Sequence, residues 1–337
     1  MDQLISDLGQ IVGPRHVLTG TDMARYSSDW LHQYQWQPRA IIRPATTEQV
    51  SEVVKLANRL KIPLVPMGGN TGLAGGTCGE AALVLSLERM AAIREIRPKS
   101  KVAIVEAGVI LSNLHAAADA EDLLFPLTFG ARGSATLGGV LSTNAGGSNV
   151  LRYGNTRELC LGLEVVTAQG EVWSGLTGLR KDNTGYDLRH LFIGSEGILG
   201  FITQATLKLT APPKNATVLV LGLSDMDAIM RVLERIQSTA SLLAYEFFSE
   251  LAVSKVVEHA GVARPFDTQT PFYALIEFEN DSESIEAALF DAVEACMEEG
   301  WVIDAVMSQS VAQARALWRL REDISETLTR WTPYKND

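Results

Sequence analysis

The residues best suited to carry chemistry form a glycine-rich segment, Pro66 to Gly76, with five glycines in eleven residues. It directly follows the run Ile62 to Val65, whose apolar residues indicate a β-strand. Glycine adopts positive φ without strain and has no Cβ, so successive backbone N–H groups can turn toward one anion. We therefore expect this loop to hold a phosphate or pyrophosphate group. The alternative is a tight surface turn, which rarely needs so many glycines.

The familiar phosphate-binding motifs are absent from the sequence. It contains neither G-x-G-x-x-G opening a helix nor the P-loop pattern G-x-x-x-x-G-K-[ST]. Gly133 and Gly138 have the glycine spacing of a P-loop, but Gly139 and Val140 follow them instead of lysine and a hydroxyl residue. No nucleophile elbow of the form G-x-S-x-G occurs either. The sequence therefore argues against a nucleoside triphosphatase, a phosphotransferase or a hydrolase.

Two further glycine-rich blocks follow, at residues 126–147 and 183–203. The earlier block contains three glycine pairs or Gly-Ser pairs, and the later one contains Gly194-Ser195-Glu196-Gly197. Together with the first loop, these ordered blocks resemble the FAD-binding domain of the FAD-linked oxidases, the superfamily of vanillyl-alcohol oxidase and p-cresol methylhydroxylase. Within it, the chain looks like the branch of D-lactate, glycolate and D-2-hydroxyglutarate dehydrogenases. The resemblance covers nearly the whole chain.

This resemblance implies bound FAD and names its contacts. The pyrophosphate would be held by the first block, at Pro66, Gly68, Gly69, Asn70, Thr71 and Gly72. The flavin and its ribityl chain would lie along the second, at Pro126, Gly133, Ser134, Gly138, Gly139, Thr143, Asn144, Gly146 and Gly147. Glu196, Gly197 and Ile202 would complete the pocket. Asn70 stands where members with covalent FAD have a histidine, and Cys78 reads as an idle thiol, so we expect non-covalent FAD.

The predicted last helix, Val311 to Arg330, carries the substrate hypothesis. Its apolar stripe is Leu317, Leu320, Ile324 and Leu328. Arg321 and Ser325 are four residues apart, which places them on one side of a helix. By resemblance to the family, Arg321, Ser325 and Lys335 would contact the substrate carboxylate. An arginine suits this role because two parallel charge-assisted hydrogen bonds fix the orientation of a carboxylate. From the residues alone, a solvated helix charge is the favoured interpretation of Arg321, and the resemblance reverses that preference.

No general base can be named from the sequence. The resembling dehydrogenases carry an H-x-G-D-G-N-x-H segment further along, and this chain lacks it. The five histidines have neither H-x-H nor H-x-x-x-H spacing, so we expect no metal site and take them as surface or packing residues. We therefore expect a truncated chain, a partner chain or an unrecognised residue that completes the site.

The order of apolar runs predicts an α+β fold in two domains. Residues 1–210 would form a two-part FAD-binding domain of the p-cresol methylhydroxylase type, with a helix opened by a capping box of Thr46 and Gln49. Two prolines in residues 210–215 favour a linker. Residues 216–337 contain two strand–helix–strand units, which indicate a ferredoxin-like cap domain that is incomplete at its C-terminus.

Composition narrows the class of protein without naming a ligand. The chain has 337 residues, of which 46% are apolar, and this is enough for a sizeable core. Its net charge of −11 makes a nucleic-acid partner improbable on electrostatic grounds. Three widely spaced cysteines without a C-x-x-C pair suggest a reducing cytoplasm. No apolar run is long enough to span a bilayer.

Two functions fit these observations. The first is an FAD-dependent flavoprotein oxidoreductase that oxidises D-2-hydroxyglutarate, D-lactate or glycolate by hydride transfer to flavin N5 and passes the electrons to an acceptor the sequence does not name. The second is a flavin-binding subunit that is non-catalytic or depends on a partner. The sequence leaves open which hydroxy acid is used and whether the chain forms a homodimer.

Overall fold

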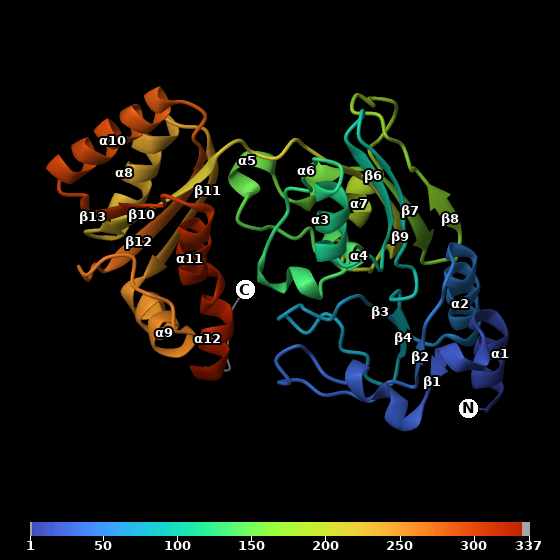
Figure 1. The fold of residues 1–337 in the computed structure, drawn as a ribbon. Helices are drawn as coiled ribbons and strands as arrows, with labels where there is room; N and C mark the ends of the chain where they lie inside the picture. The colour runs from blue at the N-terminus through green and yellow to red at the C-terminus, as the bar shows by residue number, and fades with distance from the viewer. Residues whose placement is uncertain (1, 332–337) are drawn as a thin grey trace.

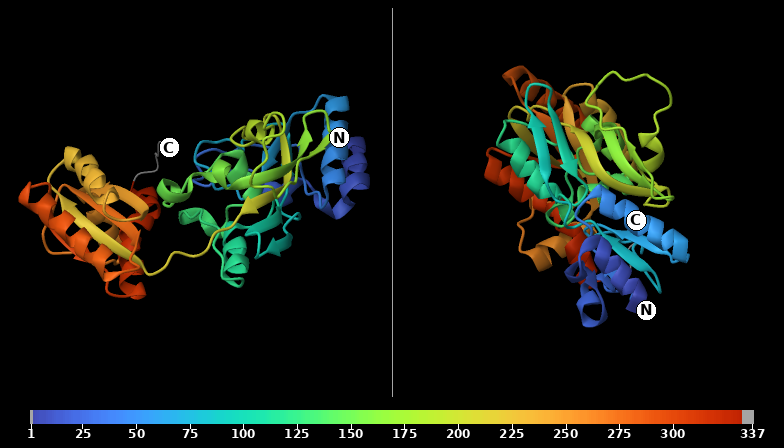
Figure 2. Two further views of the ribbon diagram at one scale, coloured as in Figure 1. Left: turned by 90° about the horizontal axis from the view of Figure 1, so that it is seen from above. Right: turned by 90° about the vertical axis from the view of Figure 1, so that its right-hand side faces the viewer.

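The computed structural model describes residues 2–331. In Figure 1 the chain forms two parts, an N-terminal part coloured blue to yellow-green and a C-terminal part coloured yellow to red. Figure 2 shows a single stretch of chain passing from one part to the other. This stretch follows strand β9 and includes the predicted linker, residues 210–215. Lys335 lies outside the described residues.

The first sheet has four strands in the order β1-β2-β4-β3, and β2, β4 and β3 run parallel. Its strands are β1 (Val17–Leu18), β2 (Ala40–Ile42), β4 (Leu83–Ser86) and β3 (Leu64–Met67). Helices α1 (Asp2–Val12) and α2 (Thr47–Leu60) cover one face and bury a core of aliphatic side chains. The 3-10 segments η1 (Pro14–His16) and η2 (Gly20–Tyr26) lead into the strands. The glycine-rich loop begins directly after β3 at the end of this sheet.

The start of α2 shows how local sequence fixes this layer. The Thr46 side chain accepts a hydrogen bond from the N–H of Gln49 at 3.3 Å, as a capping residue should. The return bond differs from the predicted capping box, because the Gln49 side chain accepts from the N–H of Ala45 instead of Thr46. Val50, Val53 and three further apolar residues of α2 face the core, whereas Leu60 at the end of the helix is 45% exposed.

The second sheet has five antiparallel strands in the order β5-β6-β9-β7-β8. They are β5 (Ile93–Arg97), β6 (Val102–Glu106), β9 (Gly200–Lys208), β7 (Cys160–Thr167) and β8 (Val172–Ser174). The short helices α3 (Leu111–Asp119), α4 (Leu137–Ser142), α5 (Val150–Tyr153), α6 (Thr156–Leu159) and α7 (Arg189–Phe192), with η3 (Gly130–Gly133), belong to this part. The apolar faces of α3 and α4 pack on β6, β7 and β9. Strands β7 and β8 were not predicted from the sequence, although β7 lies inside the sheet between β9 and β8.

The third sheet confirms the ferredoxin-like prediction. Its order is β11-β12-β10-β13, and every neighbouring pair is antiparallel. The strands are β10 (Ala216–Leu223), β11 (Leu242–Ser249), β12 (Phe272–Glu279) and β13 (Val302–Met307). Helices α8 (Met226–Gln237) and α10 (Glu283–Glu298) cover one face. The opposite face carries α9 (Glu250–Ala260), α11 (Val311–Glu322) and α12 (Ile324–Trp331).

The predicted last helix is two helices in the structure. It is interrupted at Asp323, whose φ and ψ of −77° and −7° close α11, and α12 begins at the next residue. Asp323 also accepts a hydrogen bond from Nε of Arg319 at 3.0 Å. Beyond this break α12 packs against α9, whereas α11 lies on the sheet. Arg321 and Ser325 therefore belong to different helices, and the expectation that they share one side of a single helix is wrong.

Removing a core side chain of the C-terminal part should destabilise it strongly. Phe278 is fully buried between the sheet and helices α8 and α10. We expect Phe278→Ala to lower the free energy of unfolding by about 3–5 kcal/mol, because the change removes apolar burial and leaves a cavity. Phe290→Ala on α10, where the side chain is 52% exposed, should change it by less than about 0.5 kcal/mol. Urea unfolding followed by circular dichroism measures both, and equal losses would contradict the assigned core.

Candidate active site

The loop after β3 lies directly against the segment before α4. A Cβ built on Gly69 would lie 2.0 Å from the carbonyl oxygen of Ser134, and one on Gly68 would lie 2.4 Å from Oγ1 of Thr136. Real Cβ atoms do not come this close to other atoms, so only glycine lets the two backbones approach each other here. The first two predicted glycine blocks are therefore neighbours in space, although about 65 residues separate them in sequence.

The loop is held by side chains and leaves backbone N–H groups available. Asn70 has a φ of +52°, its side-chain amide donates to the carbonyl of Ser28 at 2.8 Å, and its Oδ1 accepts from Oγ1 of Thr77 at 2.7 Å. Within residues 2–331, the N–H groups of residues 69–72 make no hydrogen bond. Consecutive donors without partners, one of them on a residue with positive φ, form the kind of concave site that binds an anion.

The third block closes on the other two. Glu196 has a φ of +52° and donates its N–H to the carbonyl of Ser142 at 2.8 Å. Gly197, at φ +81°, lies so close to Pro66 that a Cβ would be 2.4 Å from Cγ of that proline. Asn144, at φ +49°, accepts a hydrogen bond from the N–H of Arg157 on its Oδ1 at 3.0 Å. The three segments predicted separately from sequence thus meet in one place.

The remaining predicted residues fall into two groups. Gly138 and Gly147 serve close packing, since a Cβ would lie 2.7 Å from Cβ of Ala107 in the first case and 2.1 Å from the Thr128 carbonyl in the second. The other residues vary in exposure: Gly133, Thr143 and Gly146 are exposed, whereas Ser134 and Gly139 are half-buried and Pro126 is buried. Ile202 is 3% exposed and packs in the core of the second sheet.

Two glycines and one hydroxyl indicate that a ligand fits against these segments. A Cβ on Gly72 or Gly133 would meet no atom within 4 Å, and neither residue has positive φ. Packing and backbone conformation therefore do not require glycine at either position, and the space beside both backbones is open to a ligand. Thr136 Oγ1 is buried and has no hydrogen-bond partner among the described residues. These features match the pyrophosphate and flavin contacts expected of FAD.

The C-terminal part meets these segments through ion pairs. Arg132 of η3 donates to Glu322 of α11 at 3.2 Å. Arg152 of α5 donates to Glu279 of β12 at 2.7 Å and also bonds the side chain of Ser241. Because α5 follows Gly146 and Gly147 after two residues, the predicted flavin-lining backbone is tied directly to this contact. We call this place, defined by Arg132, Arg152, Glu279 and Glu322, the junction.

Arg321 lies next to the junction in the last turn of α11. Its Nε donates to Oε2 of Glu246 on β11 at 2.5 Å. One turn earlier, Trp318 donates its ring N–H to Glu277 on β12 at 3.2 Å. Burial raises the pKa of the Glu277 carboxyl, against the opposing effect of the Trp318 hydrogen bond. Ser325 is exposed in the first turn of α12, where its carbonyl accepts from Thr329 at 2.7 Å.

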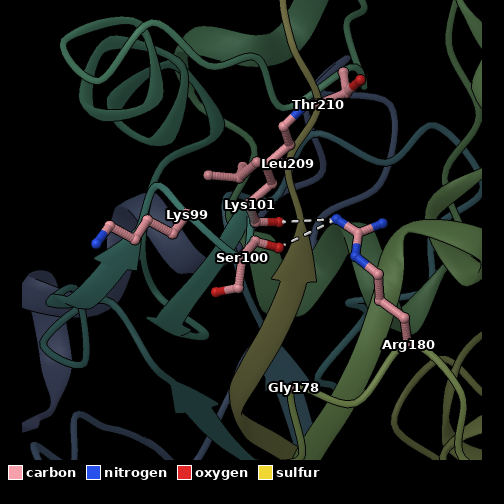
Figure 3. Close-up of a pocket in the computed structure, with 7 residues that line it drawn as sticks. All are labelled: Lys99, Ser100, Lys101, Gly178, Arg180, Leu209 and Thr210. Atoms are coloured by element: carbon pink, nitrogen blue, oxygen red, sulfur yellow. Dashed lines mark hydrogen bonds between the residues drawn. The ribbon is translucent and has the colours of Figure 1, made fainter.

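A separate pocket lies at the far end of the second sheet. It has a volume of about 500 Å³ and is lined by Lys99, Ser100, Lys101, Gly178, Arg180, Leu209 and Thr210. Figure 3 shows Arg180 reaching toward the carbonyls of Ser100 and Lys101, which accept from it at 3.3 and 3.5 Å, while the Lys99 side chain points away. Strand β9 begins beside Gly197 and ends at this pocket, so its length separates the two places by roughly 30 Å.

Several residues of the site were not predicted from the sequence. They are Thr136, Arg132, Arg152, Glu246 and Glu277. Thr136 could have been found, because it stands between glycines of the second block. The charged residues carry no comparable pattern, since their partners come from distant parts of the chain. Among the described residues, no cluster of three or more His, Cys, Asp or Glu side chains is arranged to hold a metal ion. None of the helices in the described part is long and apolar enough to cross a membrane.

Comparison with known proteins identifies both parts of the chain. Residues 38–175 match the family described as FAD binding domain, and residues 212–337 match the family described as FAD linked oxidases, C-terminal domain. The chain is 45% identical to D-2-hydroxyglutarate dehydrogenase of Stutzerimonas stutzeri over 336 residues, which span 99% of this chain and 72% of that protein. It is 46% identical to the enzyme of the same name from Xanthomonas citri pv. viticola, over 94% of this chain and 67% of that protein.

The fold also matches a solved structure. The structure of p-cresol methylhydroxylase with substrate bound superposes with a TM-score of 0.74 at 19% identity, and the match covers 98% of this chain and 72% of that one. At this identity the likeness establishes the fold, which is the two-part FAD-binding domain and cap expected from the glycine blocks.

Two alanine substitutions in one loop should have different effects. Gly72→Ala should leave the free energy of unfolding of the FAD-free protein within about 0.5 kcal/mol of wild type, because the added methyl meets nothing. It should weaken FAD binding about tenfold or more by blocking close approach of the ligand. Gly69→Ala should disturb folding itself, because its methyl would clash with the Ser134 carbonyl. Thermal unfolding and FAD titration measure both quantities, and an unchanged FAD affinity in Gly72→Ala would refute the assigned cradle.

Proposed function

Because the chain belongs to the FAD-linked oxidase family, we propose that it oxidises a D-2-hydroxy acid, and specifically D-2-hydroxyglutarate, with FAD as the hydride acceptor. The chain is thus an FAD-dependent oxidoreductase, and D-2-hydroxyglutarate is the substrate that we propose for it. The observation that carries it is the placement of Arg321 beside the junction, where the cap meets the glycine segments. The names of the two bacterial relatives support the choice of D-2-hydroxyglutarate.

The two parts of the chain divide the work. Residues 1–210 would hold FAD, with the N–H groups of residues 69–72 against the pyrophosphate and the segments around Ser134, Asn144 and Glu196 along the flavin. Residues 216–337 would bind the substrate carboxylate. Bound FAD supplies the two-electron acceptor that a hydroxy-acid oxidation needs. Asn70 is committed to Ser28 and Thr77 through its side chain, which supports non-covalent binding at this loop.

The residues of the cap would orient the substrate. A guanidinium that binds the carboxylate through two parallel hydrogen bonds leaves the hydroxyl-bearing carbon one bond away in a defined direction. Such positioning contributes to rate by holding the reacting C–H bond in place. Arg132 and Arg152 lie at the same junction, where each is paired with a carboxylate of the cap.

A second candidate function rests on the general base, to which no residue has been assigned. The chain spans 72% and 67% of the two bacterial dehydrogenases. We have assigned no general base, and removing such a group typically costs about a hundred- to ten-thousand-fold in rate. The alternative is therefore a flavin-binding subunit that is non-catalytic or is completed by a partner.

Three free cysteines, two of them buried, agree with the reducing cytoplasm that we propose as the location of the protein.

Substrate-driven bleaching of the flavin tests the proposed function. We expect anaerobic D-2-hydroxyglutarate to reduce the flavin of the FAD-loaded chain, with its L-enantiomer giving no reduction. Arg321→Ala should slow reduction by about a hundredfold while leaving FAD bound, because the carboxylate loses a charged bidentate partner. Arg319→Ala is the matched control on the same helix, since Arg319 pairs with Asp323 instead. Failure of every D-2-hydroxy acid to bleach the flavin would favour the subunit, and equal rates in the two variants would remove Arg321 from the site.

Denaturation tests the mode of FAD attachment. We expect acid precipitation of the FAD-loaded protein to release all of its flavin into the supernatant, because no covalent bond holds it. The absorbance of the pellet and of the supernatant near the flavin maximum measures the two fractions. Flavin that stays with the pellet in wild type but is released from Cys78→Ser would instead show a thioether at the exposed Cys78.

A further inference from the structure

Glu246 holds the guanidinium of Arg321 by a single atom. We infer that Glu246 is a positioning residue, which fixes Arg321 through Nε so that both terminal nitrogens are presented together to a substrate carboxylate. This inference rests on the proposed function and goes beyond it by adding a residue from another strand of the cap. Nothing in the sequence connects the two residues, which are 75 positions apart.

The contact leaves one mode of carboxylate binding. A guanidinium can bind a carboxylate side-on, with Nε and one Nη as donors, or end-on, with Nη1 and Nη2 as donors. Glu246 Oε2 lies 2.5 Å from Nε and occupies the side-on edge. Within residues 2–331, Nη1 and Nη2 of Arg321 make no hydrogen bond. The end-on edge is therefore the one available for a ligand.

Burial shows which partner is the fixed one. The Glu246 side chain is 18% exposed on its strand, whereas the Arg321 side chain is 41% exposed at the end of its helix. The carboxylate thus belongs to the framework, and the arginine is the group that reaches out from it. A long arginine side chain without such an anchor would sample many rotamers, and ordering it on binding would cost entropy.

The neighbouring residues repeat the same arrangement. Glu277 pairs with Ala244 across the β11–β12 ladder, and Ala244 is two residues before Glu246, so both carboxylates stand on the same face of the sheet. Trp318 and Arg321, three residues apart on α11, each donate one N–H to one of them. These two bonds fix the last turn of α11 on the sheet, beside Glu322, which reaches Arg132.

A competing role for Glu246 makes the opposite prediction. If Glu246 were only a counter-ion that the substrate must displace, removing its charge would strengthen anion binding. If it positions Arg321, removing the acceptor weakens binding although the site becomes more positive. Glu246→Gln separates charge from geometry, because its side-chain oxygen can still accept from Nε. Glu246→Leu removes both the charge and the acceptor at similar volume.

The test measures binding without turnover. Isothermal titration of the FAD-loaded chain with the unreactive product, the five-carbon 2-oxo dicarboxylate, gives a Kd for wild type and each variant. We expect Glu246→Leu to bind about tenfold more weakly and Glu246→Gln to stay within about threefold of wild type. Unchanged or tighter binding by Glu246→Leu, or equal weakening in both variants, would overturn the inference. FAD content and thermal unfolding provide the folding control.

The outcome stays separable from that of the proposed function. If the product binds but no hydroxy acid reduces the flavin, the dehydrogenase assignment fails while the Kd series still decides the role of Glu246. If wild type binds no dicarboxylate, both fail. Should Glu246→Leu not fold, Glu246→Gln decides alone: tighter binding means a counter-ion and overturns the inference, and retained binding with the unchanged Nε–H resonance of Arg321 by NMR supports it.

Discussion

The close approach of two backbones at Gly69 is the constraint on which the rest of the site depends. With the carbonyl of Ser134 at the place where a side chain would begin, the loop after the parallel sheet lies flat against the segment that enters the antiparallel sheet. This contact orients a row of N–H donors that have no partner among residues 2–331. Donors that are already oriented bind an anion without the entropic cost of ordering a loop. The same contact explains why the two sheets of this part act as one cofactor-binding unit.

The glycine-rich segments are continuous in sequence with α5 and η3, and these two elements contact the cap. Gly146 and Gly147 lead into α5, whose Arg152 bonds the cap sheet, and η3 contributes Arg132 to the cap helix. These ion pairs are partly exposed and are worth only about 0–1 kcal/mol each, so they select a relative orientation more than they hold the parts together. The position of Arg321 depends on the Arg132–Glu322 ion pair, because α11 carries both Glu322 and Arg321. The substrate site that we propose is therefore formed at the interface and not by either part alone.

The sequence predicted the features that depend on local residue type. The glycine blocks were recognisable because glycine itself is what the close approaches require, and the two strand–helix–strand units predicted in residues 216–337 are present in the third sheet. Strand β7 was missed although it is an apolar run, because two glycine blocks drew the interpretation of that region toward loops. No glycine or proline at Asp323 predicts the break between α11 and α12. The break arises from the packing of α12 on α9. The Glu246–Arg321 pair could not be predicted, since only the register of β11 and the placement of α11 bring those side chains together.

A crystal structure of the chain with FAD and the five-carbon 2-oxo dicarboxylate tests the central claim most directly. We expect the pyrophosphate of FAD to lie within hydrogen-bond distance of the N–H groups of residues 69–72. We also expect one carboxylate of the acid to bind Nη1 and Nη2 of Arg321, while Nε of Arg321 stays bonded to Glu246. FAD bound away from these glycines, or a carboxylate held elsewhere while Arg321 remains unoccupied by ligand, would contradict it.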